Sequence, residues 1–379
     1  MIVKDNLYGT IEFTDLEERI INTAEFQRLR RIKQMSVTNL VYPCANHTRF
    51  EHSLGTAYLA GLIANRLLED EDERNKTRLY GLLHDIGHVA FSHEGEDILS
   101  RYLGTHEEIG ERIISNSEIA DIINENYSAR EITEMKKSSL GAIVDADIGA
   151  DRMDYLKRDA LNTGVAYGLI DIDRLLHTTK RKNEKLCITE GGLEAAEWLL
   201  IARFMMFSTV YLHKTVRIAT AMLHKAIEMS LEDGTMKPED FIWIGDDFAL
   251  CKMRESKKAE PYIDGILKRN LFKEVLAIPE KNAARKEIEK TKNKIIEKYG
   301  CEIIVDYPTS FSKPVSLMIL KKNGKLVKLE ELSEIVASLR EAEEKRRKIL
   351  ILAKEKDKKK YGRIIAREFE QHTSRNEQT

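Results

Sequence analysis

The 379 residues of the chain, 42% hydrophobic and 33% charged, indicate a globular protein with one large core or two smaller ones. The net charge of -2 excludes a general electrostatic attraction to nucleic acid or to anionic membranes. The four cysteines have no CxxC spacing, and no apolar stretch is long enough for a membrane span or a signal core, so we expect reduced thiols, a cytoplasmic location and no membrane partner.

The first two-thirds of the chain shows the periodicity of amphipathic helices. Apolar residues recur at helical spacing over 54–67, and Ser53 before them is a suitable N-cap, which predicts a helix that begins there. A second buried helix is predicted over 79–87, because Gly87 is a typical C-terminal signal.

Two more helices follow in this part of the chain. One is predicted to begin at His106 after Thr105, with acidic residues in its first turn and isoleucines on its apolar side. A long helix is predicted over 195–230, where methionines are most simply core filler.

The pattern changes after residue 234. Charged helices are predicted to about residue 299, followed by strands over 302–306 and 315–320, the second of which pairs with 326–327. A last helix is predicted over 329–369. We therefore expect a mainly α chain with an all-α lobe, 1–234, and a smaller C-terminal α+β lobe, 235–379.

The dipeptide His84-Asp85 lies within the apolar run LLHDIGH. With His52 upstream and Asp151 downstream it offers two imidazoles and two carboxylates, a set that suits one divalent ion such as Mn, Fe, Mg or Zn. A structural ion pair is the alternative for the dipeptide alone. A metal ion would polarise a phosphoryl oxygen and activate water, so the set predicts a metal-dependent phosphohydrolase.

Four of the ten histidines, from His84 to His106, fall within 23 positions. A single buried histidine is more often a satisfied core residue than a functional one, but a core rarely needs four imidazoles so close in sequence. His93 and His106 are candidates for the general acid, and Glu107 is a candidate to orient an imidazole. Candidates to neutralise a polyanion are Arg49, Arg152, Arg203 and Lys214, each of which alone is more simply a surface ion pair.

A set of ordered motifs extends this pattern over residues 5–217. The motifs are FQRLRRIKQ (26–34), TRFEHSLG (48–55), HDIGHVAFSH (84–93), THE (105–107), DRMDYLKRD (151–159) and YLHK (211–214). In these motifs the chain resembles the HD-domain proteins and, within that superfamily, the deoxynucleoside triphosphate triphosphohydrolases, including dGTPase-like proteins.

The resemblance implies an HD-domain helical core and a role for each matching residue. His52, His84, Asp85 and Asp151 match the metal ligands. His93 matches the catalytic acid, with His106 and Glu107 in support. The positions that match substrate-binding residues are His88, Arg49, Arg152 and Arg203 for the triphosphate, Gln34 and Asp159 for the sugar 3′-hydroxyl, and Tyr155, Tyr211 and Met35 for the deoxyribose.

Three positions depart from the family pattern. Met35 stands where the human member has Leu, and the more adaptable side chain puts the exclusion of a 2′-hydroxyl in question. Asn22 stands where an Asp reads guanine in the activating site, while Gln27 and Arg30 are kept, so activation by guanine nucleotides is also in question. Arg152 replaces a Lys at a phosphate contact.

The resemblance implies hydrolysis of (deoxy)nucleoside triphosphates to nucleoside and triphosphate by a homo-oligomer, a dimer or tetramer, with a nucleotide effector as a further candidate partner. Two alternatives stay open. One is an HD phosphohydrolase acting on GTP, another nucleotide or a phosphodiester, and the other is a nucleotide sensor with little turnover. The basic segment 345–363 is expected to be a solvated helix face or a subunit contact rather than a nucleic-acid site.

Overall fold

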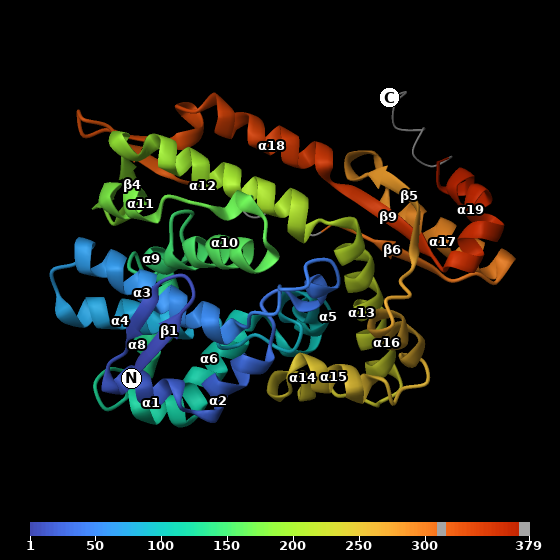
Figure 1. Cartoon of the computed structure of the whole chain (residues 1–379), viewed down its shortest axis with the longest axis horizontal. Helices are drawn as coiled ribbons and strands as arrows, with labels where there is room; N and C mark the ends of the chain where they lie inside the picture. The colour runs from blue at the N-terminus through green and yellow to red at the C-terminus, as the bar shows by residue number, and fades with distance from the viewer. Residues whose placement is uncertain (309–315, 371–379) are drawn as a thin grey trace. The chain divides into compact units, whose positions relative to one another are not determined.

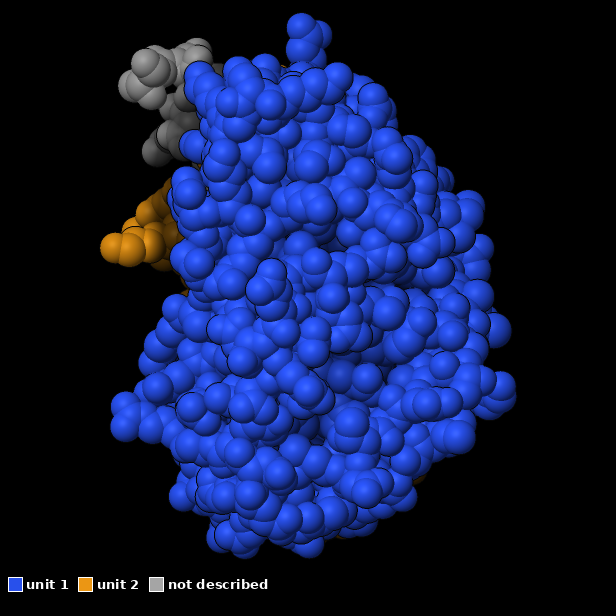
Figure 2. Space-filling model, turned by 90° about the vertical axis from the view of Figure 1, so that its left-hand side faces the viewer, with its two compact units in different colours: residues 1–206, 237–249, 314–337 blue, residues 207–236, 250–313, 338–379 orange. Residues whose placement is uncertain are grey.

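The computed structural model describes residues 1–308 and 316–370 (Figure 1). The chain forms two compact units, which Figure 2 shows in different colours. Unit 1 comprises residues 1–206, 237–249 and 314–337, and unit 2 comprises residues 207–236, 250–313 and 338–379. The predicted division of the chain into separate domains at residue 234 stays a prediction.

Helices dominate the chain, as predicted, and strands are few and short. The helices are α1 Asp15–Ile21, α2 Ala24–Gln27, α3 Arg49–Leu67, α4 Glu71–Leu83, α5 Ser92–Leu103, α6 His106–Asn116, α7 Glu118–Ile123, α8 Ala129–Glu134, α9 Ala142–Asp145, α10 Ala150–Thr163, α11 Ile172–Thr178, α12 Leu193–Met206, α13 Lys214–Glu232, α14 Asp240–Trp243, α15 Asp246–Met253, α16 Glu260–Leu267, α17 Arg285–Tyr299, α18 Glu334–Arg346 and α19 Glu355–Glu370. The strands are β1 Ile2–Asp5, β2 Gly9–Glu12, β3 Thr179–Lys182, β4 Lys185–Thr189, β5 Lys273–Pro279, β6 Ile303–Asp306, β7 Met318–Leu320, β8 Leu326–Lys328 and β9 Lys348–Ala353.

The core of unit 1 is built around α3, which packs against α4 and α10 (Figure 1). Small residues such as Ala57, Ala60 and Ala64 are fully buried along α3 and allow the close approach of the neighbouring helices. This central helix therefore carries His52 into the interior of the unit, where its side chain is completely covered.

Helix α3 begins four residues before the predicted start at Ser53. Thr48 is its N-cap, and the carboxylate of Glu51 accepts a hydrogen bond from the Thr48 N–H at 2.6 Å. Since this capping interaction satisfies a backbone donor, it fixes the start of the helix at Arg49. Ser53 instead lies buried inside α3.

The second predicted helix is also displaced, because α4 is capped by Asp70 and ends at Leu83. Gly87 does not terminate it, and its φ lies outside the left-handed region. A Cβ at this position would overlap the backbone of His106 and Gly110. The glycine is thus required for the close approach of the 84–91 segment to α6.

Helix α6 was predicted correctly. Thr105 accepts a hydrogen bond from the Glu108 N–H, and Glu108 accepts one from the Thr105 N–H at 2.8 Å. The predicted apolar side is buried, with Ile109, Ile113 and Ile114 in the core. This N-terminal turn places His106 at the site described below.

Unit 1 also contains two small sheets. Strands β1 and β2 form an antiparallel hairpin, and a four-stranded sheet has the order β3-β4-β7-β8, with β4 and β7 parallel. The predicted pairing of 315–320 with 326–327 is confirmed for β7 and β8, while residues 309–315 lie outside the described part.

The core of unit 2 is a three-stranded antiparallel sheet of order β5-β9-β6, against which α19 packs (Figure 1). The prediction of one helix over 329–369 was wrong, because the apolar run 349–353 forms the central strand between α18 and α19. In this strand Ile351 pairs with Leu276 on one side and Val305 on the other.

The long helix predicted over 195–230 is interrupted. Helix α12 ends at Met206, residues Phe207–Tyr211 form a π-helical turn, and α13 begins at Lys214. Among the described residues no single helix is long and apolar enough to cross a membrane, although the bent pair Glu190–Tyr211 and Lys214–Glu232 passes by length and composition alone.

Candidate metal centre and acid–base cluster

Four predicted metal ligands converge in unit 1. Nε2 of His52 in α3 lies 3.4 Å from Oδ2 of Asp85 and 3.1 Å from Oδ1 of Asp151, which α10 carries. Nε2 of His84, which follows the end of α4, lies 3.4 Å from Oδ1 of Asp85 and 3.6 Å from Oδ1 of Asp151. The four side chains can therefore surround one ion.

The ring orientations fit a metal ion. Nδ1 of His52 contacts Asp154 Oδ2 at 2.7 Å, and Nδ1 of His84 contacts the carbonyl oxygen of Gly81 at 2.9 Å. Each ring thus donates through Nδ1 and directs its Nε2 lone pair inward. Both Nε2 atoms are buried without a hydrogen-bond partner among the described residues, as expected for atoms that bind a cation.

The local charges also favour cation binding. Burial acts to raise the pKa of Asp85, but His84 and Arg49 hold it well below its usual value. Burial likewise opposes charge on Asp154, whose pKa is lowered by Arg158 and His52. Both carboxyl groups are therefore ionised at neutral pH.

A buried set of ion pairs fixes His52 on the Nδ1 side of its ring. Arg158 forms two hydrogen bonds of 2.9 Å with Asp154 and a third of 2.9 Å with Asp5, at the end of β1. A Cβ at Gly55 would overlap the side chains of Asp154 and Arg158, so only glycine fits opposite this pair. The geometry of His52 thus depends on residues far apart in the sequence.

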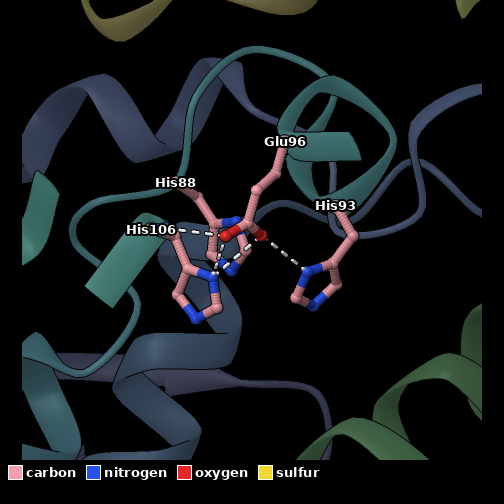
Figure 3. A group of neighbouring side chains, drawn as sticks. All are labelled: His88, His93, Glu96 and His106. Atoms are coloured by element: carbon pink, nitrogen blue, oxygen red, sulfur yellow. Dashed lines mark hydrogen bonds and ion pairs between the residues drawn. The ribbon is translucent and has the colours of Figure 1, made fainter. Parts of the chain in front are cut away.

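Three imidazoles and one carboxylate form a second group beside the first, the acid–base cluster of His88, His93, Glu96 and His106 (Figure 3). Nδ1 of His106 lies 2.9 Å from both oxygens of Glu96, and Nδ1 of His93 lies 3.2 Å from Oε2. The rings of His88 and His106 are stacked at 4.2 Å. Nε2 of His88 lies 3.3 Å from Oδ1 of Asp85, which joins the cluster to the metal ligands.

The partner of His106 is Glu96 rather than Glu107. Oε1 of Glu107 lies 4.0 Å from Nε2 of His106, and its carboxylate forms an ion pair with Lys136. Burial acts to raise the pKa of Glu96, but hydrogen bonds with His106 and His93 hold it below its usual value. The contact expected of Glu107 is made by Glu96, and a catalytic role for Glu107 stays a prediction.

A strained backbone turn presents His93 at the start of α5. Phe91 and Ser92 have φ values of 68° and 55°, which non-glycine residues rarely adopt. The turn is held by Asp246, which accepts from the Phe91 N–H at 2.8 Å, and by the hydroxyl of Ser92, which donates to the carbonyl oxygen of Lys33 at 2.7 Å. His93 itself points outward, with 62% of its side chain exposed.

Two buried arginines hold the loop and the carboxylates together. Arg49 donates to Asp85 Oδ2 at 2.6 Å and to the Ser92 hydroxyl at 2.9 Å. Arg28 donates to the carbonyl oxygens of His88 and Ile86 in the loop that follows α4. The predicted phosphate contact Arg49 therefore already bridges the metal ligands and the turn before His93.

The other two predicted phosphate contacts share one carboxylate. Arg152 and Arg203 both lie against Oδ1 of Asp147, the second at 3.9 Å, and the other oxygen of Asp147 accepts from the Ser316 N–H at 2.6 Å. Burial raises the pKa of nearby Tyr155, against the effect of Arg152 and Arg203. The structure thus brings Arg152, Arg203 and Tyr155 together on α10 and α12.

The predicted sugar-binding residues meet at a histidine that the sequence did not single out. Nε2 of His47 lies 2.7 Å from Oδ1 of Asp159, with both side chains buried. The backbone N–H of Gln34 donates to the carbonyl oxygen of His47 at 2.9 Å, and Met35, which follows, is buried. Oε1 of Gln34 has no hydrogen-bond partner among the described residues.

Like the polyanion candidate Lys214, Tyr211 lies in unit 2. It ends the π-helical turn in unit 2, where its ring packs edge-on against Phe207 at 4.9 Å. Its expected contact with a sugar stays a prediction.

The matching protein-family models cover most of the chain. The HD domain model matches residues 49–159, and the model of the HD associated region matches residues 170–379. The first range contains the four candidate metal ligands and the acid–base cluster.

Individual proteins extend this likeness. An uncharacterized protein of Methanocaldococcus jannaschii is 37% identical over 361 residues, which cover 90% of this chain and 76% of that protein. A Dictyostelium discoideum protein named deoxynucleoside triphosphate triphosphohydrolase SAMHD1 homolog is 30% identical, over 80% of this chain and 60% of that protein. The solved structure of a phosphohydrolase from Bacteroides thetaiotaomicron superposes with a TM-score of 0.77 at 26% identity, covering 93% of this chain and 99% of that one. The chain belongs to the HD-domain family, with an HD domain followed by an HD-associated region.

Proposed function

We propose that this protein hydrolyses deoxynucleoside triphosphates to deoxynucleoside and inorganic triphosphate. The observation that carries the proposal is the 3.3 Å contact between Asp85 and His88, which joins the candidate metal ligands to the acid–base cluster. Water would attack the α-phosphorus, the bond from phosphorus to O5′ would break, and O5′ would take up a proton. The likeness to a named deoxynucleoside triphosphate triphosphohydrolase supports this substrate class.

His52, His84, Asp85 and Asp151 would hold a divalent ion. Such an ion supplies Lewis-acid polarisation of a phosphoryl oxygen and lowers the pKa of water, whatever the identity of the metal. Asp154 and the Gly81 carbonyl oxygen keep the Nε2 atoms of the two histidines directed at the site.

His93 would protonate the leaving O5′. Its Nδ1 lies 3.2 Å from Glu96, so the protonated ring donates there through Nδ1 and presents Nε2–H to the substrate. The exposure of the side chain leaves this edge open to a ligand. His106 would hold Glu96 in place from the opposite side, at 2.9 Å.

Three groups of residues would bind the nucleotide. Arg152 and Arg203, positioned by Asp147, would neutralise the triphosphate, with Arg49 at the α-phosphate. Asp159 or the amide oxygen of Gln34 would accept the single proton of the 3′-hydroxyl, since both offer a buried oxygen. Tyr155 and Met35 would pack against the deoxyribose, and the contact of Tyr211 with the sugar stays a prediction of the resemblance.

The decisive experiment incubates the purified chain with each deoxynucleotide and ribonucleotide, with Mn or Mg, in water enriched in oxygen-18. We expect deoxynucleoside and triphosphate as products, with the heavy oxygen in the triphosphate. If the products were instead nucleoside monophosphate and pyrophosphate, the proposed release of intact triphosphate would be contradicted. Nucleotide binding with no product over hours would favour the alternative of a nucleotide sensor. Turnover of phosphodiesters alone would favour the alternative of an HD phosphohydrolase with another substrate.

Asp85→Ala tests the ligand assignment. The variant should lose both bound metal and turnover, while Asp173→Ala, which removes an exposed carboxylate from α11, should keep both. Metal content at the wild-type level in Asp85→Ala would contradict the assignment. The same substrate panel repeated with added GTP and dATP would test whether a nucleotide effector activates the protein. The molecular mass in solution would test the expected homo-oligomer.

A further inference from the structure

The acid–base cluster has the composition of a metal site in its own right. One ligand atom from each of His88, His93, Glu96 and His106 lies within 4.8 Å of every other. Figure 3 shows the three rings arranged around the carboxylate of Glu96. Three imidazoles with one carboxylate form a donor set that Zn²⁺ and similar ions prefer, whereas the first ligand set has two carboxylates.

Two of the separations between donor atoms are close to those of a tetrahedral site. Glu96 oxygens lie 2.9 Å from Nδ1 of His106 and 3.2 Å from Nδ1 of His93. The edge of a zinc tetrahedron with nitrogen and oxygen ligands is roughly 3.3 Å long. Loss of the shared protons would turn these two hydrogen bonds into coordination, and His88 would join them after one of the stacked rings has turned.

His88 provides an independent reason to expect a ligand. Its side chain is 0% exposed, and Nδ1 has no hydrogen-bond partner among the residues that the structure describes. A buried imidazole nitrogen without a partner is costly, and a bound cation would satisfy it. The rings of His88 and His106 are stacked at 4.2 Å with an angle of 10° between their planes, so one of them must turn before both can direct a nitrogen lone pair at the same ion.

Solvent can reach the cluster through His93. This side chain is 62% exposed, while Glu96 is 16% exposed and His106 18% exposed. An ion could thus enter from outside and be held by the more deeply placed ligands without movement of the backbone.

We propose that His88, His93, Glu96 and His106 bind a second transition-metal ion of the Zn²⁺ type, separate from the first ligand set, and that this ion inhibits the enzyme. His93 as a ligand no longer carries the proton that the leaving oxygen needs. The inhibitory part rests on the proposed function, whereas the binding part stands on the geometry alone.

Metal content tests the binding part. The full chain is stripped with a chelator, equilibrated with increasing Zn²⁺ and measured for bound metal by mass spectrometry. We expect two ions per chain for the wild type, one for His93→Asn and one for Glu96→Gln, a nearly isosteric change. His177→Asn, which removes an exposed histidine of α11, should retain two.

Cobalt gives a second readout that does not depend on activity. A visible absorption band of tetrahedral Co²⁺ should appear with the second equivalent of metal in the wild type. The band should be absent in His93→Asn, and the circular dichroism spectrum of this variant would check that it is folded. One ion per wild-type chain, or two ions in both His93→Asn and Glu96→Gln, would overturn the site.

Turnover tests the inhibitory part. Enzyme loaded with one Mn²⁺ should lose about 100-fold or more of its rate as Zn²⁺ fills the cluster, since a general acid contributes about that much. Two bound ions with undiminished turnover would overturn the inhibition. Two bound ions in a protein that hydrolyses no nucleotide with any metal would support the site and contradict the proposed function instead.

Discussion

The carboxylate of Asp246 accepts a hydrogen bond from the backbone N–H of Phe91 at 2.8 Å, across 155 positions of sequence. It also accepts one from the Lys33 N–H at 3.0 Å. Phe91 is the first residue of the left-handed turn that presents His93. A single buried carboxylate therefore joins three distant segments at a strained turn of the backbone.

The stability of the chain should depend on the protonation of Asp246. Burial raises the pKa of this carboxyl group to about 6, against the two backbone hydrogen bonds, from an ordinary value of 3.8. Between these two pH values the folded state holds a proton that the unfolded state has lost. The free energy of unfolding should then fall as pH rises through this window, by roughly 3 kcal/mol from this group.

Asp246→Asn should remove this dependence, because the amide does not titrate. Urea unfolding at several pH values from 4 to 7 would measure the difference between the variant and the wild type. Asp247→Asn is the matched control, since the Asp247 side chain is 87% exposed and its curve should parallel the wild type. Parallel curves for Asp246→Asn as well would show that Asp246 is not buried as described.

Glu96 and Glu107 provide a test of which carboxylate serves the imidazoles. Glu96→Gln should lower kcat by about 100-fold, because one neutral amide oxygen cannot serve His93, His106 and the His106 N–H together and no longer favours a protonated imidazole. The KM should change little, since Glu96 is not expected to touch the substrate. The rate of deoxynucleotide hydrolysis at saturating substrate gives the measurement.

Glu107→Gln is the control for that substitution. Its carboxylate pairs with Lys136 and stays 4.0 Å from His106, so kcat should remain within a few-fold of the wild type. A larger loss for Glu107→Gln than for Glu96→Gln would restore the role that the sequence pattern suggested for Glu107.

Local signals in the sequence located the start of α6 and strand β6 of unit 2, predicted over 302–306, but not strands β5 and β9. Thr105 and Glu108 form a capping box that depends only on neighbours, and it was recognisable before the structure. The apolar run 349–353 is as short as one buried helical turn, and periodicity cannot distinguish the two. Its partners β5 and β6 lie far away in the sequence, so its assignment as a strand depends on contacts that no local pattern contains.

The same distinction applies to the site. The four candidate metal ligands could be predicted from motifs, and the structure brings them together, whereas the contacts of Asp154 and His47 were not predicted. Glu96 had a usable signal, because it lies three positions after His93 and so on the same helix face. Asp246 had none, since only the folded backbone brings it to Phe91.

His47 is expected to position Asp159 for the sugar. His47→Ala would deprive the buried Asp159 carboxylate of its 2.7 Å partner, which should lower the free energy of unfolding by roughly 1–3 kcal/mol. The KM for deoxynucleotides should rise about tenfold, since one hydrogen bond of that strength is lost or misdirected. The KM for 2′,3′-dideoxynucleotides should change less, because they lack the 3′-hydroxyl.

The comparison of the two substrates separates positioning from general damage. If the KM rose equally for deoxynucleotides and 2′,3′-dideoxynucleotides, His47 would not act through the 3′-hydroxyl, and its loss would instead damage the fold in general. His177→Ala, at an exposed position, should leave both constants unchanged.

Gly87 tests whether the segment 84–91 depends on close backbone approach. Gly87→Ala should lower the free energy of unfolding by about 1–3 kcal/mol, because the methyl group would overlap the backbone of α6 at His106 and Gly110. Gly362→Ala is the control, since its nearest neighbour is Lys358 Cγ at 3.5 Å, and an alanine inside α19 should stabilise the chain by roughly 0.5–1 kcal/mol.

A third variant distinguishes close approach from a helix C-cap at the same residue. Asparagine tolerates the left-handed conformation of a C-cap but is larger than alanine, so Gly87→Asn should be less stable than Gly87→Ala if packing decides. Urea unfolding of the three variants gives the order. An asparagine variant more stable than the alanine variant would mean that Gly87 ends α4 as the sequence pattern predicted, and that His88 reaches the cluster by another backbone path.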